Sequence, residues 1–155
     1  MSIDRWSRAW RGVWLIVLLA TAGGAAAVPP EPLVLDGVAY EHRWSKSGQN
    51  EYTPPGQEDL ARWDDTLTLI TRPEIADGEA LAALANGVLA NYEGAGVILR
   101  TDSRPATPDQ PAEHLAVAIL GGGQMAEAAF ARLLLHDGAG LIVVRSRRAY
   151  GESAA

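Results

Sequence analysis

The sequence contains no cysteine among its 155 residues. This absence excludes disulfide bonds, a cysteine-ligated zinc site and the attachment of a lipid at a cysteine. A folded domain must therefore be stabilised by packing alone. Long hydrophobic runs are also lacking, because the strongest one, residues 13–22, is half as long as the stretch of about 20 residues that spans a membrane.

Residues 1–27 have the pattern of a secretory signal peptide. Three arginines precede the apolar run, two glycines interrupt it, and the alanines at 25–27 supply the small residues that a signal peptidase requires. A retained membrane anchor is the less favoured alternative, because the run is short. The pattern predicts cleavage after Ala27 and a periplasmic protein, with full secretion as the alternative location.

The chain has little positive charge once this segment is set aside. Residues 28–155 carry a net charge of −8, which argues against nucleic acid and anionic lipid surfaces as general partners. Their number suits one domain. We predict an extended, proline-rich lead-in at 28–32, a single domain at 33–150 and a flexible tail at 151–155.

The first part of this domain is predicted to be rich in strands. Residues 33–44 favour β structure, with a tight turn or bulge at Asp36–Gly37, and residues 66–71 alternate threonine with leucine. The polar, proline- and glycine-containing residues 45–57 predict a loop. Residues 58–63 predict a short helical turn.

One helix is predicted at residues 77–92. Asp77 is suited to cap it, and apolar residues recur at spacings of three and four, at Leu81, Leu84, Val88 and Tyr92. Gly87 in its interior costs about 1 kcal/mol against alanine, and we interpret it as a residue that permits close packing on the sheet.

Further strands are predicted after the helix, with short connections between them. They cover residues 97–101, 113–120, 127–136 and 141–148. The segment 126–135 also tolerates a helix, but the turn signal at 137–140 favours a hairpin. Residues 113–120 are predicted to be buried on both faces of the sheet. The order predicts an α+β domain, in which an antiparallel sheet of about five to six strands carries one main helix on one face.

Recognisable catalytic motifs are absent. The glycines at 121–123 lack the lysine and hydroxyl residues of a phosphate loop, and the serines lack a G-x-S-x-G context. His42, His114 and His136 are isolated from one another, so we predict no metal site, no cofactor and no catalytic residue.

Two clusters are candidate binding sites. Trp63 is followed by Asp64 and Asp65 and preceded by further carboxylates, which would suit a cation or a basic partner, although a solvated acidic surface is the favoured interpretation.

The second cluster contains Arg145, Arg147, Arg148 and Tyr150. Arg145 and Arg147 would lie on one face of a strand and could hold a carboxylate or phosphate in forked geometry. The same arginines could instead protect an edge strand from pairing with other molecules.

Several segments carry a resemblance. Residues 52–63 (YTPPGQEDLARW), 65–70 (DTLTLI), 111–114 (PAEH) and 147–151 (RRAYG) are similar to small exported bacterial proteins with no assigned activity. The order of strands, helix and meander also resembles the Mog1/PsbP-like layout, a scaffold used for binding and accessory roles. The resemblance implies such a role and carries over no catalytic residue.

Together these features predict a non-enzymatic periplasmic binding or accessory protein that contacts another envelope or secreted protein. An inhibitor or immunity-type protein and an envelope assembly factor are both compatible with it. A small hydrolase with a site not visible in the sequence, and a structural envelope protein, are the alternatives.

Overall fold

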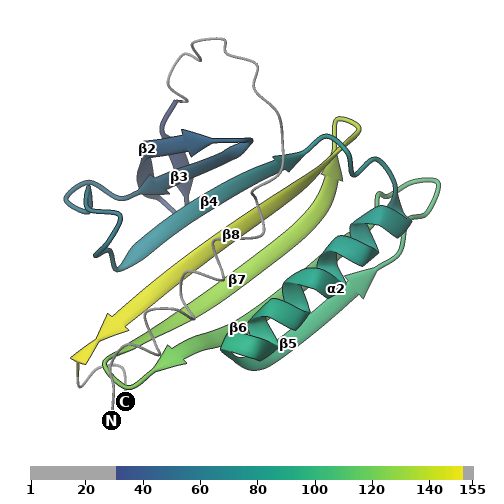
Figure 1. Cartoon of the computed structure of the whole chain (residues 1–155). Coiled ribbons are helices and arrows are strands. Elements are labelled where there is room, and N and C mark those ends of the chain that lie inside the picture. Colours follow the sequence, from purple (N-terminus) through teal and green to yellow (C-terminus); the bar gives the residue numbers. More distant parts are fainter. Residues whose placement is uncertain (1–30, 152–155) are drawn as a thin grey trace.

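The computed structural model describes residues 31–151, which form one antiparallel sheet and one helix (Figure 1). The predictions for residues 1–27, for most of the lead-in and for residues 152–155 lie outside the described part of the chain. Strands follow one another across the sheet in the order β1-β2-β3-β4-β8-β7-β6-β5. The elements are β1 (Leu33–Leu35), β2 (Val38–Lys46), β3 (Gln49–Thr53), β4 (Asp65–Arg72), α2 (Gly78–Ala95), β5 (Gly96–Arg104), β6 (Glu113–Gly122), β7 (Met125–His136) and β8 (Ala139–Tyr150).

The predicted sheet of five to six strands is wrong, because eight strands form it. The additional strands come from the N-terminal part. Residues 33–44 are divided at Asp36–Gly37, where both residues have positive φ values of 52° and 78°, so that β1 and β2 form a hairpin. The segment predicted as a loop contains β3, since Ser47 and Gly48 form a second turn of the same kind, with φ values of 50° and 81°.

At residues 58–63, where a short helical turn was predicted, the structure has no assigned helix. The structure has a single turn there, closed by a hydrogen bond of 3.0 Å from the amide of Arg62 to the carbonyl of Asp59. The side-chain oxygen of Gln57 accepts hydrogen bonds from the amides of Asp64 and Asp65, at 2.8 and 2.9 Å. These bonds hold the loop against the start of β4 in place of a helix.

The helix begins as the sequence predicts. The Asp77 carboxylate accepts a hydrogen bond of 2.8 Å from the Ala80 amide, and Leu81 is fully buried. The interpretation of Gly87 is wrong, because it is exposed and a Cβ placed there would meet no atom within 4 Å. Residues 126–135 are strand, since they lie within β7.

The sheet carries a different cover on each face. We call the face toward α2 the inner face and the other the outer face. On the inner face α2 packs on alanines of β6 and β7, whose small side chains let the helix lie close: Ala116, Ala118, Ala129 and Ala131. On the outer face the β1–β2 hairpin packs over β3 and β4, where Tyr40, Tyr52 and Leu67 form a second core.

The two covers lie over different halves of the sheet. In Figure 1, α2 runs along β5 and β6, while β2 and β3 lie at the opposite side of the sheet. Two areas therefore remain without a cover from the described residues: the outer face of β5–β7, and the inner face of β4 and β8. None of the helices within residues 31–151 is both long and apolar enough to cross a membrane.

Candidate functional site

The two clusters predicted from the sequence meet at one end of the sheet. Strand β4 pairs with β8, and this register places Asp65 opposite Arg147. The amide of Arg148 donates a hydrogen bond of 2.9 Å to the carbonyl of Asp64. Segments that are about 80 residues apart in the sequence therefore form a single arrangement of charges.

Arg145 and Arg147 both lie on the outer face, as the alternation of β8 predicts. Arg145 donates from Nη2 to Asp65 at 3.0 Å and from Nη1 to Asp36 at 3.2 Å. The hydrogen bond and attraction of Asp65 raise the pKa of Arg145. Its guanidinium is thus held by carboxylates of this chain, whereas the Arg147 side chain is 64% exposed and lies 4.0 Å from Asp65.

Trp63, Arg148 and Tyr150 form the inner side of this arrangement. The Arg148 guanidinium lies 3.8 Å from the centre of the Trp63 ring, and its Nε is 2.9 Å from a carboxylate oxygen of Glu127. The Tyr150 hydroxyl donates a hydrogen bond of 2.8 Å to the Trp63 carbonyl. Trp63 is 3% exposed and Asp64 is exposed, so the indole is part of the interior rather than a surface anchor.

The outer face of β5–β7 exposes an apolar patch that the sequence prediction missed. Val97, Ile119 and Phe130 are 63%, 37% and 45% exposed, and Leu99 in the bulge of β5 is 60% exposed. In the register, Val97 lies opposite Ile119, and Phe130 lies between Val117 and Arg145. The sequence signal was the alternation of large residues with alanine in residues 113–120.

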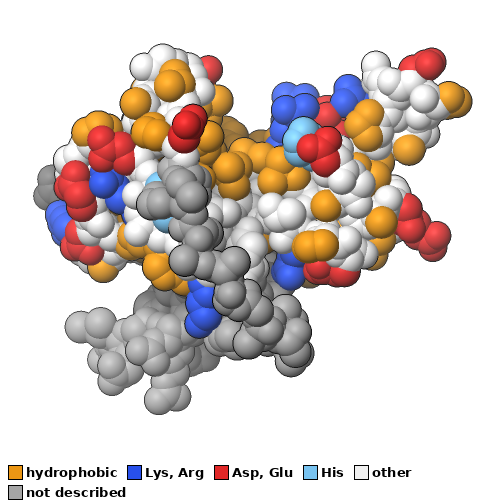
Figure 2. Space-filling model, turned by 90° about the horizontal axis from the view of Figure 1, so that it is seen from above, with side chains coloured by type: hydrophobic (Ala, Val, Ile, Leu, Met, Phe, Trp, Pro, Cys, Tyr) orange, Lys and Arg blue, Asp and Glu red, His pale blue; other side chains and the backbone are white. Residues whose placement is uncertain are grey.

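That alternation was misread as burial on both faces. The alanines of β6 are buried under α2, and the large residues between them face outward, where no other described element covers them. We call the patch made by Val97, Leu99, Ile119 and Phe130, together with the neighbouring Arg145 and Arg147, the outer patch. Charged side chains of both signs lie among hydrophobic ones on the face seen in Figure 2.

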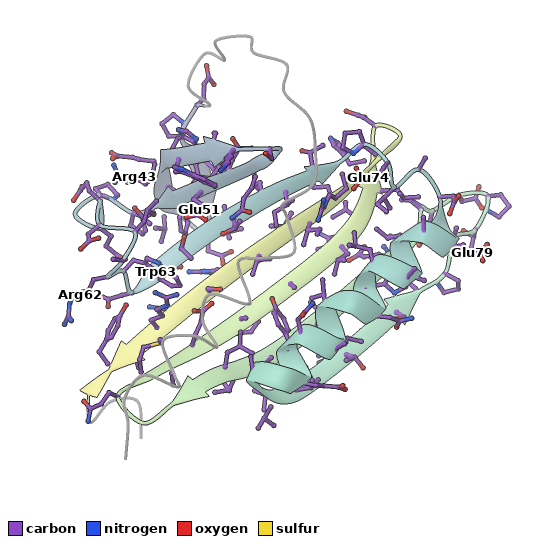
Figure 3. All side chains as sticks on the ribbon, viewed as in Figure 1. Arg43, Glu51, Arg62, Trp63, Glu74 and Glu79 are labelled. Atoms are coloured by element: carbon purple, nitrogen blue, oxygen red, sulfur yellow. The ribbon has the colours of Figure 1, made fainter. Side chains whose placement is uncertain are left out.

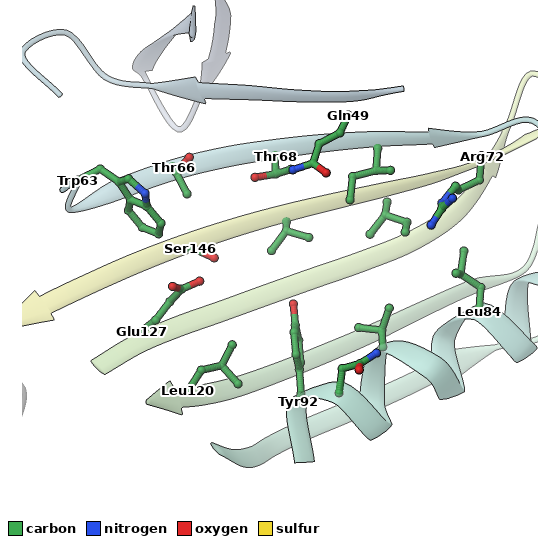
Figure 4. A pocket seen from close by; sticks show the side chains of 15 residues that line it. Gln49, Trp63, Thr66, Thr68, Arg72, Leu84, Tyr92, Leu120, Glu127 and Ser146 are labelled. Atoms are coloured by element: carbon green, nitrogen blue, oxygen red, sulfur yellow. The ribbon is translucent and has the colours of Figure 1, made fainter. Parts of the chain in front are cut away.

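A cleft of about 140 Å³ lies on the inner face between α2 and the strands β4 and β8 (Figure 4). Ile70, Ile142 and Val144 line its strand side, while Leu84 and Val88 line its helix side. Polar side chains gather at one end of the cleft, where Figure 4 shows Trp63, Ser146, Glu127 and Tyr92. Arg72 lies at the other end.

The polar end holds buried charged groups. Glu51 and Glu127, both buried, face one guanidinium, that of Arg148. Burial raises the pKa of Glu51, and the hydrogen bond from Gln49 at 2.8 Å and the attraction of Arg148 oppose this only in part. Figure 3 shows Glu51 and Trp63 at the same end of the sheet.

The Tyr92 hydroxyl stays protonated in this environment. Burial, with a smaller contribution from the nearby Glu127 carboxylate, raises its pKa well above the usual range. Tyr92 and Ser146 are 7% and 4% exposed, and among the described residues neither hydroxyl has a hydrogen-bond partner. The Tyr92 hydroxyl is directed into the cleft in Figure 4.

Histidine–serine pairs occur twice, without the geometry of a hydrolase. Ser103 Oγ lies 2.9 Å from His114 Nδ1, but His114 Nε2 is buried and has no partner among residues 31–151, so no carboxylate orients the ring. His42 Nε2 contacts Ser45 at 2.6 Å, and that hydroxyl donates to an amide oxygen. In the described part of the chain no three potential metal ligands come together.

No known protein family matches this chain, and no curated protein matches it in sequence. The resemblance to small exported bacterial proteins and to the Mog1/PsbP-like layout therefore stays a prediction.

Proposed function

We propose that this protein is a non-enzymatic, periplasmic binding protein that recognises another protein through the outer patch. The observation that carries this proposal is the gathering of exposed apolar side chains on one sheet face that residues 31–151 leave uncovered. Four of the six large hydrophobic residues that are exposed in residues 31–151 belong to it: Val97, Leu99, Ile119 and Phe130.

The composition of the patch is typical of a protein-binding surface. Aromatic and arginine side chains contribute most to such interfaces, and Phe130 lies directly opposite Arg145 in the register. Arg145 is already neutralised by Asp65 and Asp36, whereas Arg147 is exposed at the edge of the patch. The partner surface is therefore expected to combine apolar residues with a carboxylate that faces Arg147.

The proposal is tested with two variants and two matched controls. Phe130→Ser removes the aromatic centre, and Arg147→Glu reverses the exposed charge without breaking the ion pair of Arg145. Val34→Ser and Lys46→Glu make the same types of change at exposed positions of β1 and β2 that are not part of the patch.

Proteins retained from periplasmic extract by the wild type are identified, purified and titrated by calorimetry against each variant. We expect a 1:1 complex whose affinity falls about tenfold or more with each patch variant and stays unchanged with each control. A partner that binds all four variants equally would contradict the proposal. Association of the protein only with itself would also contradict it.

A further inference from the structure

We propose that the inner cleft is a second binding site, independent of the outer patch, for a small apolar molecule that carries an amine. The apolar part would lie between α2 and the strands β4 and β8, and the ammonium group would lie at the end formed by Glu127, Ser146 and Tyr92. The argument uses the size of the cleft, its unsatisfied polar groups and its charge.

The size and lining of the cleft suit one ring or a short alkyl chain. Its volume of about 140 Å³ is similar to that of a known engineered apolar cavity of about 150 Å³, which binds benzene. The middle of the cleft is lined by aliphatic side chains from three elements, such as Ile70, Val88 and Val144.

Hydrogen-bonding capacity is left over at the polar end. The hydroxyls of Tyr92 and Ser146 belong to residues that are more than nine-tenths buried, yet neither bonds to another described residue. Trp63, which is buried to the same degree, likewise has no side-chain hydrogen bond there. All three residues line the cleft, so their polar atoms are available to a polar ligand atom or to water there.

The charge at this end favours a cation over an anion. Glu127 lines the cleft, and Glu51, which does not, is hydrogen-bonded to Gln49, which does. Arg148 offsets one of these two carboxylates, and its guanidinium is already engaged by Glu127 and the Trp63 ring. An ammonium group would bond to carboxylate oxygens at this end, where a carboxylate ligand would be repelled, and Arg72, the guanidinium that lines the cleft, lies at the opposite end.

Three probes of nearly equal shape separate charge from apolar contact. They are 2-phenylethylamine, 2-phenylethanol and 3-phenylpropionate, each titrated by calorimetry into the full chain. We expect the amine to bind at least about tenfold more tightly than the alcohol, and the carboxylate to bind most weakly. Equal affinity for all three probes, preference for the carboxylate, or no binding of any probe at millimolar concentration would overturn the proposal.

Variants of the chain test where the probes bind. Thr68 lies in β4 within the cleft, whereas Thr71 of the same strand is exposed outside it. Thr68→Trp is expected to abolish binding of the amine and the alcohol, and Thr71→Trp, the matched control, to leave both unchanged. Equal binding by these two variants would place the probes elsewhere and overturn the proposal.

Two carboxylate variants test the role of charge. Glu127→Gln is expected to lower the affinity for the amine about tenfold and to leave that for the alcohol unchanged. Because Glu127→Gln weakens the ion pair with Arg148, Glu51→Gln is a second variant that leaves the pair intact, and it should lower only the affinity for the amine. An amine affinity that stays unchanged in both carboxylate variants would overturn the proposal. Neither variant changes a residue of the outer patch.

Discussion

Two glycines of the helix region are expected to respond in opposite ways to replacement by alanine. Gly96 follows the last residue of α2 and begins β5. A Cβ at Gly96 would overlap the carbonyl oxygen of Ile119 and lie 2.8 Å from the Cα of Leu120, closer than real Cβ atoms approach other atoms. The backbone φ of −179° is accessible to any residue, so the expected cost is steric alone.

Because backbone atoms of β6 would have to move, Gly96→Ala is expected to destabilise the fold by about 1–3 kcal/mol or more. Gly87→Ala is expected to stabilise it by about 0.5–1 kcal/mol, since the site is open and alanine is the better helix former. At about 4 °C per kcal/mol, thermal unfolding followed by circular dichroism separates the two variants easily. A neutral Gly96→Ala, or a destabilising Gly87→Ala, would refute the proposed packing of α2 on β6.

The remaining predictions concern single side chains, and each is checked by unfolding experiments. Burial raises the pKa of Glu51, so the folded state favours its protonated form, and the resulting stability is present at low pH and lost as pH rises through the raised pKa. Glu51→Gln should therefore raise Tm near pH 8 and have little effect near pH 3, and an equal gain at both would contradict this. Asp77→Ala should cost about 1 kcal/mol through loss of the helix cap, whereas Asp109→Ala in an exposed loop should be neutral. Leu81→Ala should cost about 2–5 kcal/mol because Leu81 is fully buried, while the exposed Leu99 should tolerate alanine within about 0.5 kcal/mol.

The sequence predicted the helix and the β7–β8 hairpin because their signals each lie within a short segment. The cap at Asp77 and the spacing of Leu81, Leu84 and Val88 defined the helix, and the turn at Asp137–Gly138, with φ values of 50° and 76°, defined the β7–β8 hairpin. Strand β3 was missed because its inward side chains are polar. Gln49, Glu51 and Thr53 are buried. Glu51 interacts with Arg148 and Gln49 lines the cleft with Trp63, so the environment of these two residues comes from segments that are distant in sequence.

The sequence identified some residues of the arginine and Trp63 clusters, but not how they pair, and it did not identify the outer patch. Arg145, Arg147 and Trp63 were identified as candidates, but their pairing with Asp65 and Arg148 depends on the register of β4 with β8. The outer patch was hidden because the alternation in residues 113–120 does not tell which set of side chains the helix covers. Small alanines, not the large residues, were the buried set.

The position of β8 within the sheet has a consequence for the order of folding. β8, the final twelve-residue strand, lies between β4 and β7 and is the only sheet connection between β1–β4 and β5–β7 among the described residues. Until β8 is available, β4 and β7 of the nascent chain each expose a long unpaired edge, which is prone to wrong pairing. Complete folding must therefore await β8, and a deletion that removes this strand should prevent it.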